Sequence, residues 1–182
     1  MSTVLRSGLA VPAAGRLTWP DVVGIVARLV LGGVLLVAGA MKLPNLPGSA
    51  LAVRAYKILP YDVAVAVGYA LPIVEVVTGA LLVVGLFTRA AAAVGSLLMM
   101  AFIIGIASAW ARGLSLDCGC FGGGGEIALA EAVKKYPWEI ARDVGLLLLG
   151  LWLVWRPATP LSLEARLFPP VSVSDDDLDE ED

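Results

Sequence analysis

Residues 90–111 contain no charged side chain, and this uninterrupted apolar run restricts the fold more than any other feature. A helix needs about 20 mostly apolar residues to cross the hydrocarbon core of a bilayer, where backbone polar groups must be satisfied within the chain. Two more runs reach this length, at 22–42 and 63–88, and they contain the internal charges Arg28 and Glu75. Three segments are therefore expected to span a membrane.

A fourth and weaker run covers 137–155 and has its charges in its first two turns, at Glu139, Arg142 and Asp143. Indole rings prefer the membrane–water interface. All five tryptophans lie at or near the ends of the four runs: Trp19, Trp110, Trp138, Trp152 and Trp155. The sequence thus predicts an all-α polytopic membrane protein, a bundle of four transmembrane helices within residues 21–157.

The composition is typical of a membrane protein, and the two chain ends differ from the rest of the chain. Hydrophobic residues make up 59% of the chain and charged residues 16%, whereas soluble domains hold about 25% charged residues. Seven of the 16 acidic residues fall in 175–182, so segment 158–182 is expected to be an acidic, disordered tail. The N-terminal tail, 1–20, lacks the apolar core of a cleavable signal peptide, so the first span should remain as a membrane anchor. The 13 basic residues form no stripe, so no nucleic-acid binding is expected.

Four spans place both chain ends on one side of the membrane and the loops 43–62 and 112–136 on the other. Cytoplasmic loops usually hold more lysine and arginine. Here five basic residues lie on the terminal side and six on the loop side. Charge therefore does not decide the orientation.

The loop 112–136 carries both cysteines, Cys118 and Cys120, separated by Gly119. Gly119 gives the backbone freedom to bring the two sulfurs together. Closing so short a loop stabilises a fold by only roughly 1.6 kcal/mol, and strained disulfides are easily reduced. The pair therefore suits electron exchange better than architecture. An inert disulfide remains an alternative, as does zinc bound with help from Asp117, Glu126 or a second copy of the chain; with no histidine present, no metal site is expected.

Two charged residues near the cysteines are candidates for tuning thiol chemistry. Arg112 could favour a thiolate, and Asp117 could oppose ionisation or shuttle a proton. Both residues are also ordinary anchors for a membrane surface.

Charges inside spans are costly and usually face partners or cavities. In an antiparallel pair of helices, Arg28 and Glu75 are expected to pair, the alternative being that Arg28 extends to the interface and Glu75 is protonated. Arg142 and Asp143 lie near the cysteine-bearing interface and are expected to be structural or to support the site. Small residues at four-residue spacing in the third run, such as Ala91 and Gly95, favour close helix contacts.

Several short motifs follow one another in a specific order along the chain. They are Arg28-Leu29, Gly39-Ala40-Met41-Lys42, Arg54-Ala55-Tyr56-Lys57-Ile58-Leu59-Pro60, Leu71-Pro72-Ile73-Val74-Glu75 with Gly79, Ser108-Ala109-Trp110-Ala111-Arg112-Gly113, Asp117-Cys118-Gly119-Cys120-Phe121-Gly122 and Arg142-Asp143. Together they resemble the DoxX/MauE family of small redox-associated membrane proteins, over residues 21–157.

This resemblance implies a multi-pass protein of the inner (cell) membrane, with cytoplasmic termini and an extracytoplasmic cysteine loop. Family members are associated with methylamine utilisation, where they help a periplasmic dehydrogenase acquire its disulfides. Others are linked to thioredoxin- or DsbA-like partners. The extracytoplasmic location of the cysteine loop fits disulfide chemistry, because disulfides persist outside the cytosol.

The expected function is a thiol–disulfide redox protein in which Cys118 and Cys120 exchange electrons with an extracytoplasmic partner. No cofactor is evident, although a quinone at the bundle edge is possible by analogy with other four-helix disulfide-forming membrane proteins. One alternative is a non-catalytic membrane chaperone or anchoring subunit for a secreted redox partner. A small-molecule transporter centred on Arg28 and Glu75 is the least favoured reading.

Overall fold

The computed structural model describes residues 18–117 and 125–156. Both cysteines and the predicted acidic tail, 158–182, lie outside the described residues. The elements follow in the order α1 (Trp19–Lys42), η1 (Leu43–Asn45), α2 (Leu46–Ala55), α3 (Tyr61–Val84), α4 (Thr88–Ala111), β1 (Leu116–Asp117), β2 (Gly125–Glu126) and α5 (Leu129–Trp155).

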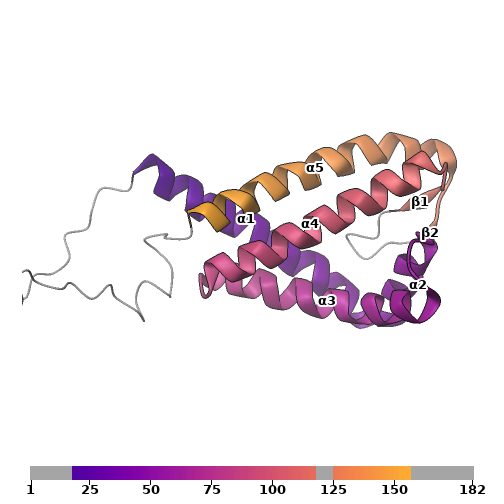
Figure 1. Ribbon diagram of the computed structural model, residues 1–182, viewed down its shortest axis with the longest axis horizontal. Helices are drawn as coiled ribbons and strands as arrows, with labels where there is room; N and C mark the ends of the chain where they lie inside the picture. Colours follow the sequence, from indigo (N-terminus) through magenta and orange to yellow (C-terminus); the bar gives the residue numbers. More distant parts are fainter. Residues whose placement is uncertain (1–17, 118–124, 157–182) are drawn as a thin grey trace, which may run out of the picture.

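Four long helices pack as two antiparallel pairs, α1 with α3 and α4 with α5, and α5 also contacts α1. The start of α1, the turn between α3 and α4 and the end of α5 lie at one end of the bundle (Figure 1). The opposite end holds α2, the two short strands and the start of α5. We call this second end, residues 43–60, 112–117 and 125–136, the loop end.

Three helical segments of the described chain are long and apolar enough to cross a membrane: Trp19–Ala55, Tyr61–Val84 and Thr88–Ala111. The first consists of α1, η1 and α2 together. The predicted count of four spans is not confirmed by this criterion. α5 has sufficient length, but Glu139, Arg142 and Asp143 interrupt its apolar sequence.

Helix starts and ends follow local sequence signals. The Thr18 backbone N–H donates to the Asp21 carboxylate at 2.9 Å and begins α1. Asn45 Oδ1 accepts from the Gly48 N–H at 3.0 Å, which caps α2. Gly85, with φ +75°, takes the left-handed conformation that ends α3.

Several helices therefore begin or end at other residues than predicted. The second span ends at Val84 rather than at 88, because Gly85 stops the helix. The last helix begins at Leu129 rather than at 137, so the predicted last span is the second part of a longer helix that runs through Pro137. Buried packing of Tyr136 and its neighbours outweighs the backbone hydrogen bond that proline removes. The predicted loop 112–136 is correspondingly shorter.

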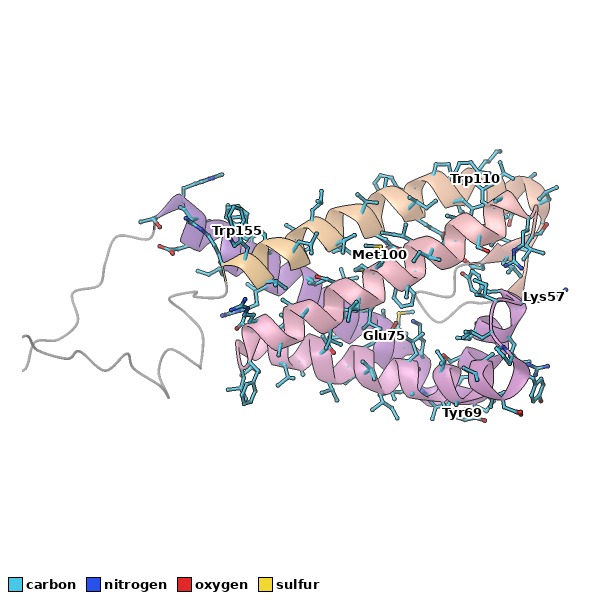
Figure 2. The ribbon with its side chains drawn as sticks, viewed as in Figure 1. Lys57, Tyr69, Glu75, Met100, Trp110 and Trp155 are labelled. Carbon is cyan, nitrogen blue, oxygen red and sulfur yellow. The ribbon has the colours of Figure 1, made fainter. Side chains whose placement is uncertain are left out.

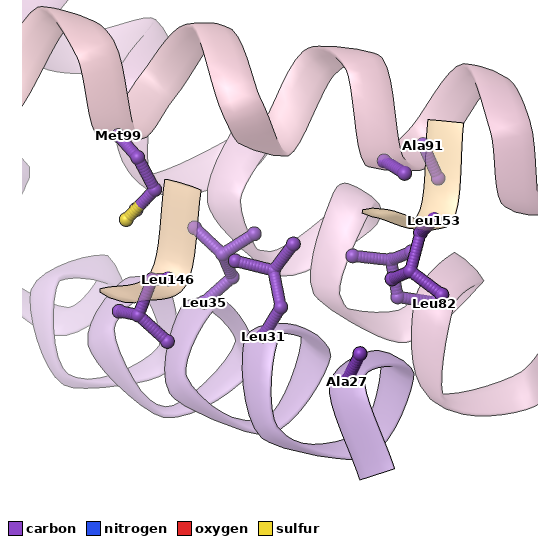
Figure 3. Packing of buried hydrophobic residues seen from close by; sticks show 9 residues of the cluster. Ala27, Leu31, Leu35, Leu82, Ala91, Met99, Leu146 and Leu153 are labelled. Carbon is purple, nitrogen blue, oxygen red and sulfur yellow. The ribbon is translucent and has the colours of Figure 1, made fainter. Parts of the chain in front are cut away.

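The main core lies where α1 meets the other three long helices (Figure 3). Leu31 and Leu35 of α1 belong to one buried cluster with side chains from α3, α4 and α5: Leu82, Ala91, Ala92, Met99, Leu146 and Leu153. The outer surface is also apolar, with Val77 52% and Leu97 70% exposed. Exposing so many apolar side chains to water is unfavourable, whereas exposing them to lipid chains is not. The structure therefore fits a bilayer environment.

Glycines allow α1 and α3 to approach until their backbones touch. A Cβ added at Gly79 would lie 2.6 Å from Leu36 N and 2.7 Å from Gly32 O. A Cβ at Gly39 would lie 2.7 Å from Pro72 O. In α4, where close helix contacts were expected, Ala91 and Gly95 are buried, and a Cβ at Gly95 would lie 3.3 Å from Leu35 Cδ1.

We expect Gly79→Ala to destabilise the protein, because the added methyl group overlaps the α1 backbone. Overpacking of this kind costs about 1–3 kcal/mol. The matched control is Gly33→Ala, since a Cβ at Gly33 meets nothing within 4 Å. Thermal unfolding in detergent, followed by circular dichroism, measures both variants. Equal melting temperatures would contradict the close contact.

Candidate functional site

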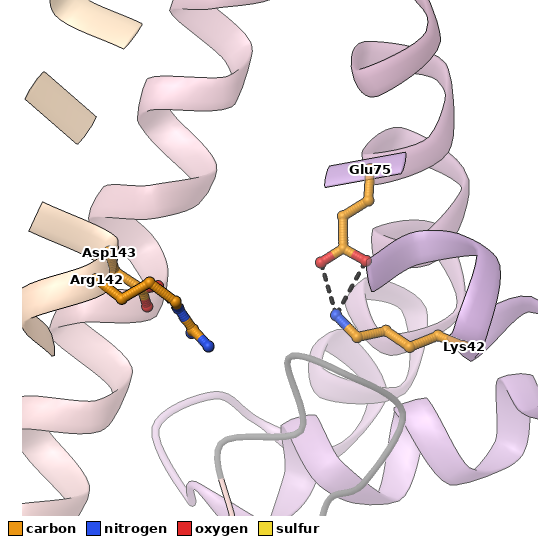
Figure 4. A network of polar contacts seen from close by, with 4 residues as sticks. All are labelled: Lys42, Glu75, Arg142 and Asp143. Atoms are coloured by element: carbon orange, nitrogen blue, oxygen red, sulfur yellow. Dashed lines mark hydrogen bonds and ion pairs between the residues drawn. The ribbon is translucent and has the colours of Figure 1, made fainter. Parts of the chain in front are cut away.

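Lys42 and Glu75 form a buried ion pair in the interior of the bundle. The Lys42 Nζ donates to both carboxylate oxygens of Glu75, at 2.7 and 2.9 Å (Figure 4). The side chains are 6% and 0% exposed. Glu75 also lies at the centre of the bundle in Figure 2. The glycine contact between α1 and α3 brings the pair together, because Gly39 lies against Glu75, one turn before Lys42.

The expected pairing of Glu75 with Arg28 is wrong, because the register of the two helices gives Glu75 to Lys42. Glu75 lies opposite Gly39, and Arg28 is eleven residues earlier, about 16 Å along the helix axis. Arg28 is itself buried, at 3% exposure, in the first half of α1. Lys42 was missed because it closes an apolar run, where a lysine usually marks the interface. Here α2 continues the bundle beyond it, so Lys42 lies inside.

Arg142 and Asp143 form a second ion pair on α5. Asp143 Oδ1 accepts from Arg142 Nε at 2.9 Å, with Arg142 Nη2 at 2.8 Å. The Arg142 side chain extends from α5 toward the Lys42–Glu75 pair (Figure 4). Glu75, Arg142 and Asp143 all line a cavity of about 10 Å³ between the pairs, room for roughly one water. We call these four residues, Lys42, Glu75, Arg142 and Asp143, the charge cluster; its formal charges cancel.

The segment that carries the cysteines is held at both ends. Asp117 of β1 is paired with Gly125 of β2, so residues on either side of 118–124 lie next to each other. The Tyr136 hydroxyl donates to Leu114 O at 2.6 Å and accepts from the Leu116 N–H at 3.0 Å. These contacts attach the start of the segment to α5.

Arg112 joins the end of α4 to the end of α2. Its guanidinium donates to Ser108 O at 3.1 Å, to Lys57 O at 3.4 Å and also to Tyr56 O. Lys57 has a φ of +51°, a left-handed conformation that is rare for lysine. Arg112 therefore stabilises the chain where α2 ends. The predicted role of Arg112 in tuning the thiols is not tested by these contacts and stays a prediction. The same holds for the half-buried Asp117.

An apolar cleft of about 340 Å³ lies at the loop end between α2, α3 and α4. Lys42, Ser49, Tyr56, Leu71, Phe102 and Gly105 are among its lining residues. Residues 18–117 and 125–156 contain no group of three potential metal ligands. Since both cysteines lie outside these residues, the zinc alternative is not tested.

Fold and site together define a class: a multi-pass helical membrane protein with paired charges buried among its helices. A family model described as methylamine utilisation protein MauE matches residues 20–156. The chain therefore belongs to the MauE family of membrane proteins, linked to methylamine utilisation. Searches of curated proteins and of solved structures found no match.

Replacing Glu75 with Met leaves the Lys42 ammonium buried without its counter-charge. We expect the free energy of unfolding to fall by about 3–5 kcal/mol. The double variant Lys42→Met, Glu75→Met removes both charges and should recover most of that loss. Denaturant unfolding in detergent micelles measures both. A double variant as unstable as Glu75→Met would show that the pair is not the cause.

Replacing Tyr136 with Phe removes the acceptor of the Leu116 N–H and the donor to Leu114 O. An unsatisfied buried group costs about 1–3 kcal/mol. We expect faster amide hydrogen exchange at residues 114–117, measured by mass spectrometry in nanodiscs. Tyr69→Phe is the control, because Tyr69 is 41% exposed. Unchanged exchange in Tyr136→Phe would exclude the anchoring role.

Proposed function

We propose that this protein is a membrane thiol–disulfide redox protein whose reactive pair is Cys118 and Cys120. The observation that supports this most directly is the pairing of Asp117 with Gly125, which holds both ends of the cysteine-bearing segment at the loop end. Residues 117 and 125 therefore fix where the cysteine-bearing segment leaves and rejoins the described structure. The proximity of Cys118 to Cys120 in the sequence supplies the chemistry.

The reaction is an exchange of two electrons. When the two thiols are oxidised, one S–S bond forms between Cys118 and Cys120, and a partner disulfide takes up two electrons and two protons. The reverse reaction reduces this pair and oxidises two partner thiols. A thioredoxin-like or DsbA-like protein, or a secreted dehydrogenase that acquires disulfides, has the chemistry required of the partner.

We infer that α5 is the fourth span and that the loop end faces the extracytoplasmic side of the cell membrane. The following observations support the fourth span. Residues 144–155 contain no charge, and Leu148 is 61% exposed on the outer face of the bundle. α5 also returns to the end of the bundle where α1 starts, as an even number of spans requires (Figure 1). Glu139 and Asp143 are buried, at 8% and 1% exposure, and the partly buried Arg142 pairs with Asp143.

We expect a membrane-impermeant maleimide to label Cys118 and Cys120 in intact cells only after treatment with a reductant. The reductant opens the disulfide and exposes thiols, and the reagent reaches them only from outside. Mass-shift electrophoresis measures the labelling. Equal labelling with and without reductant would contradict the redox proposal. Labelling only after lysis would contradict the orientation.

The double variant Cys118→Ser, Cys120→Ser separates this function from that of a non-catalytic chaperone or anchoring subunit. If the partner still acquires its disulfides in cells that carry the variant, the protein acts as a scaffold. If the partner accumulates in the reduced form, the cysteines carry electrons. Cysteine-free protein should keep the wild-type melting temperature, because so short a disulfide stabilises little.

A further inference from the structure

The apolar cleft at the loop end has the size and chemistry of a ligand site. Its volume of about 340 Å³ falls within the range of small-molecule pockets, about 300–1,000 Å³. Its walls come mainly from three helices, with Ala52 on α2, Leu71 on α3 and Gly105 on α4, and Lys42 at the end of α1 also lines it. Gly105 leaves room in the cleft, because even an added Cβ would only touch the Tyr56 ring, at 3.5 Å.

The mouth of the cleft opens on the lipid-facing side of the bundle. Ile104, inside the span Thr88–Ala111, is 57% exposed, and Ile58 is 49% exposed. Both residues line the cleft. A molecule that enters between apolar, lipid-facing side chains must itself be soluble in the bilayer.

The inner end of the cleft is polar and holds Lys42. An ammonium has three N–H donors, and two of them are used by the carboxylate of Glu75. Because Glu75 already neutralises the charge, the remaining donor suits a neutral acceptor, such as a carbonyl oxygen, better than an anion. The Phe102 ring, 5.4 Å from Lys42 Nζ, also lines the cleft, as does Tyr56. Two aromatic side chains favour a planar head group.

We propose that this cleft binds a lipid-soluble molecule with a planar, carbonyl-bearing head, the chemistry of a membrane quinone. Its carbonyl oxygen accepts a hydrogen bond from Lys42, its ring lies near Phe102 and Tyr56, and its apolar tail leaves past Ile104 into the bilayer. Binding of this ligand depends on the cleft and does not require the proposed thiol function. Only a role of this ligand as electron acceptor rests on the proposed thiol function.

The test uses the full-length protein in phosphatidylcholine nanodiscs with decylubiquinone as the probe. Quenching of tryptophan fluorescence, corrected with a protein-free nanodisc, gives the dissociation constant. Wild-type protein should show saturable binding. Gly105→Leu fills the cleft and should weaken binding at least about tenfold. Gly145→Leu is the matched control, because a Cβ at Gly145 meets nothing within 4 Å, and it should bind as wild type.

The double variant Lys42→Met, Glu75→Met removes the donor without leaving an unpaired charge, and it should weaken binding about tenfold. Saturation with equal affinity in wild type, Gly105→Leu and the double variant would overturn the proposal. So would a phospholipid that native mass spectrometry finds retained in the cleft and that decylubiquinone does not displace. The variant Cys118→Ser, Cys120→Ser should still bind the probe, so loss of thiol activity and loss of the binding site give different results.

Discussion

The ion pair between Lys42 and Glu75 ties the end of α1 to the middle of α3, and much of the loop end follows from it. Either charge alone would cost several kilocalories per mole inside a protein embedded in lipid. The pair forms only if the two helix backbones nearly touch, which Gly39 permits against Pro72 and Glu75. Once Lys42 lies inside the bundle, the chain has to continue past it. η1 and α2 provide that continuation, and Ala50 of α2 packs on Gly68 of α3.

A second set of interactions organises the loop end around this centre. Arg142 and Asp143 bring α5 to the charge cluster, so all its charges are compensated within the bundle. Nearer the start of α5, Tyr136 binds the backbone on either side of Ser115. Arg112 in turn binds the carbonyls at the end of α2. The polar centre, the apolar cleft and the attached ends of the cysteine-bearing segment are therefore parts of one connected structure.

The architecture was predictable where a single physical requirement dominates. The runs at 22–42, 63–88 and 90–111 all became helices, because a long apolar segment in lipid has few other ways to satisfy its backbone. The last helix was predicted to start too late, because Pro137 is a strong local signal that packing around Tyr136 overrides. α2 was missed, although Asn45 followed by Pro47 is a recognisable helix start. Lysine at the end of an apolar run indicates the interface in most membrane proteins. For this reason the buried position of Lys42 was not predicted.

The sequence by itself determined that the chain is a helical membrane protein, that three of its segments are long and apolar enough to cross a bilayer, and that its two cysteines are neighbours. These properties depend on composition and on the order of residues along the chain. Only the tertiary structure decided which buried charges are partners, because the register between α1 and α3 depends on where Gly32, Gly39 and Gly79 allow the backbones to meet. It also decided that α2, α3 and α4 enclose a cleft beside Lys42. Contacts between residues distant in the chain depend on packing, which no local pattern records.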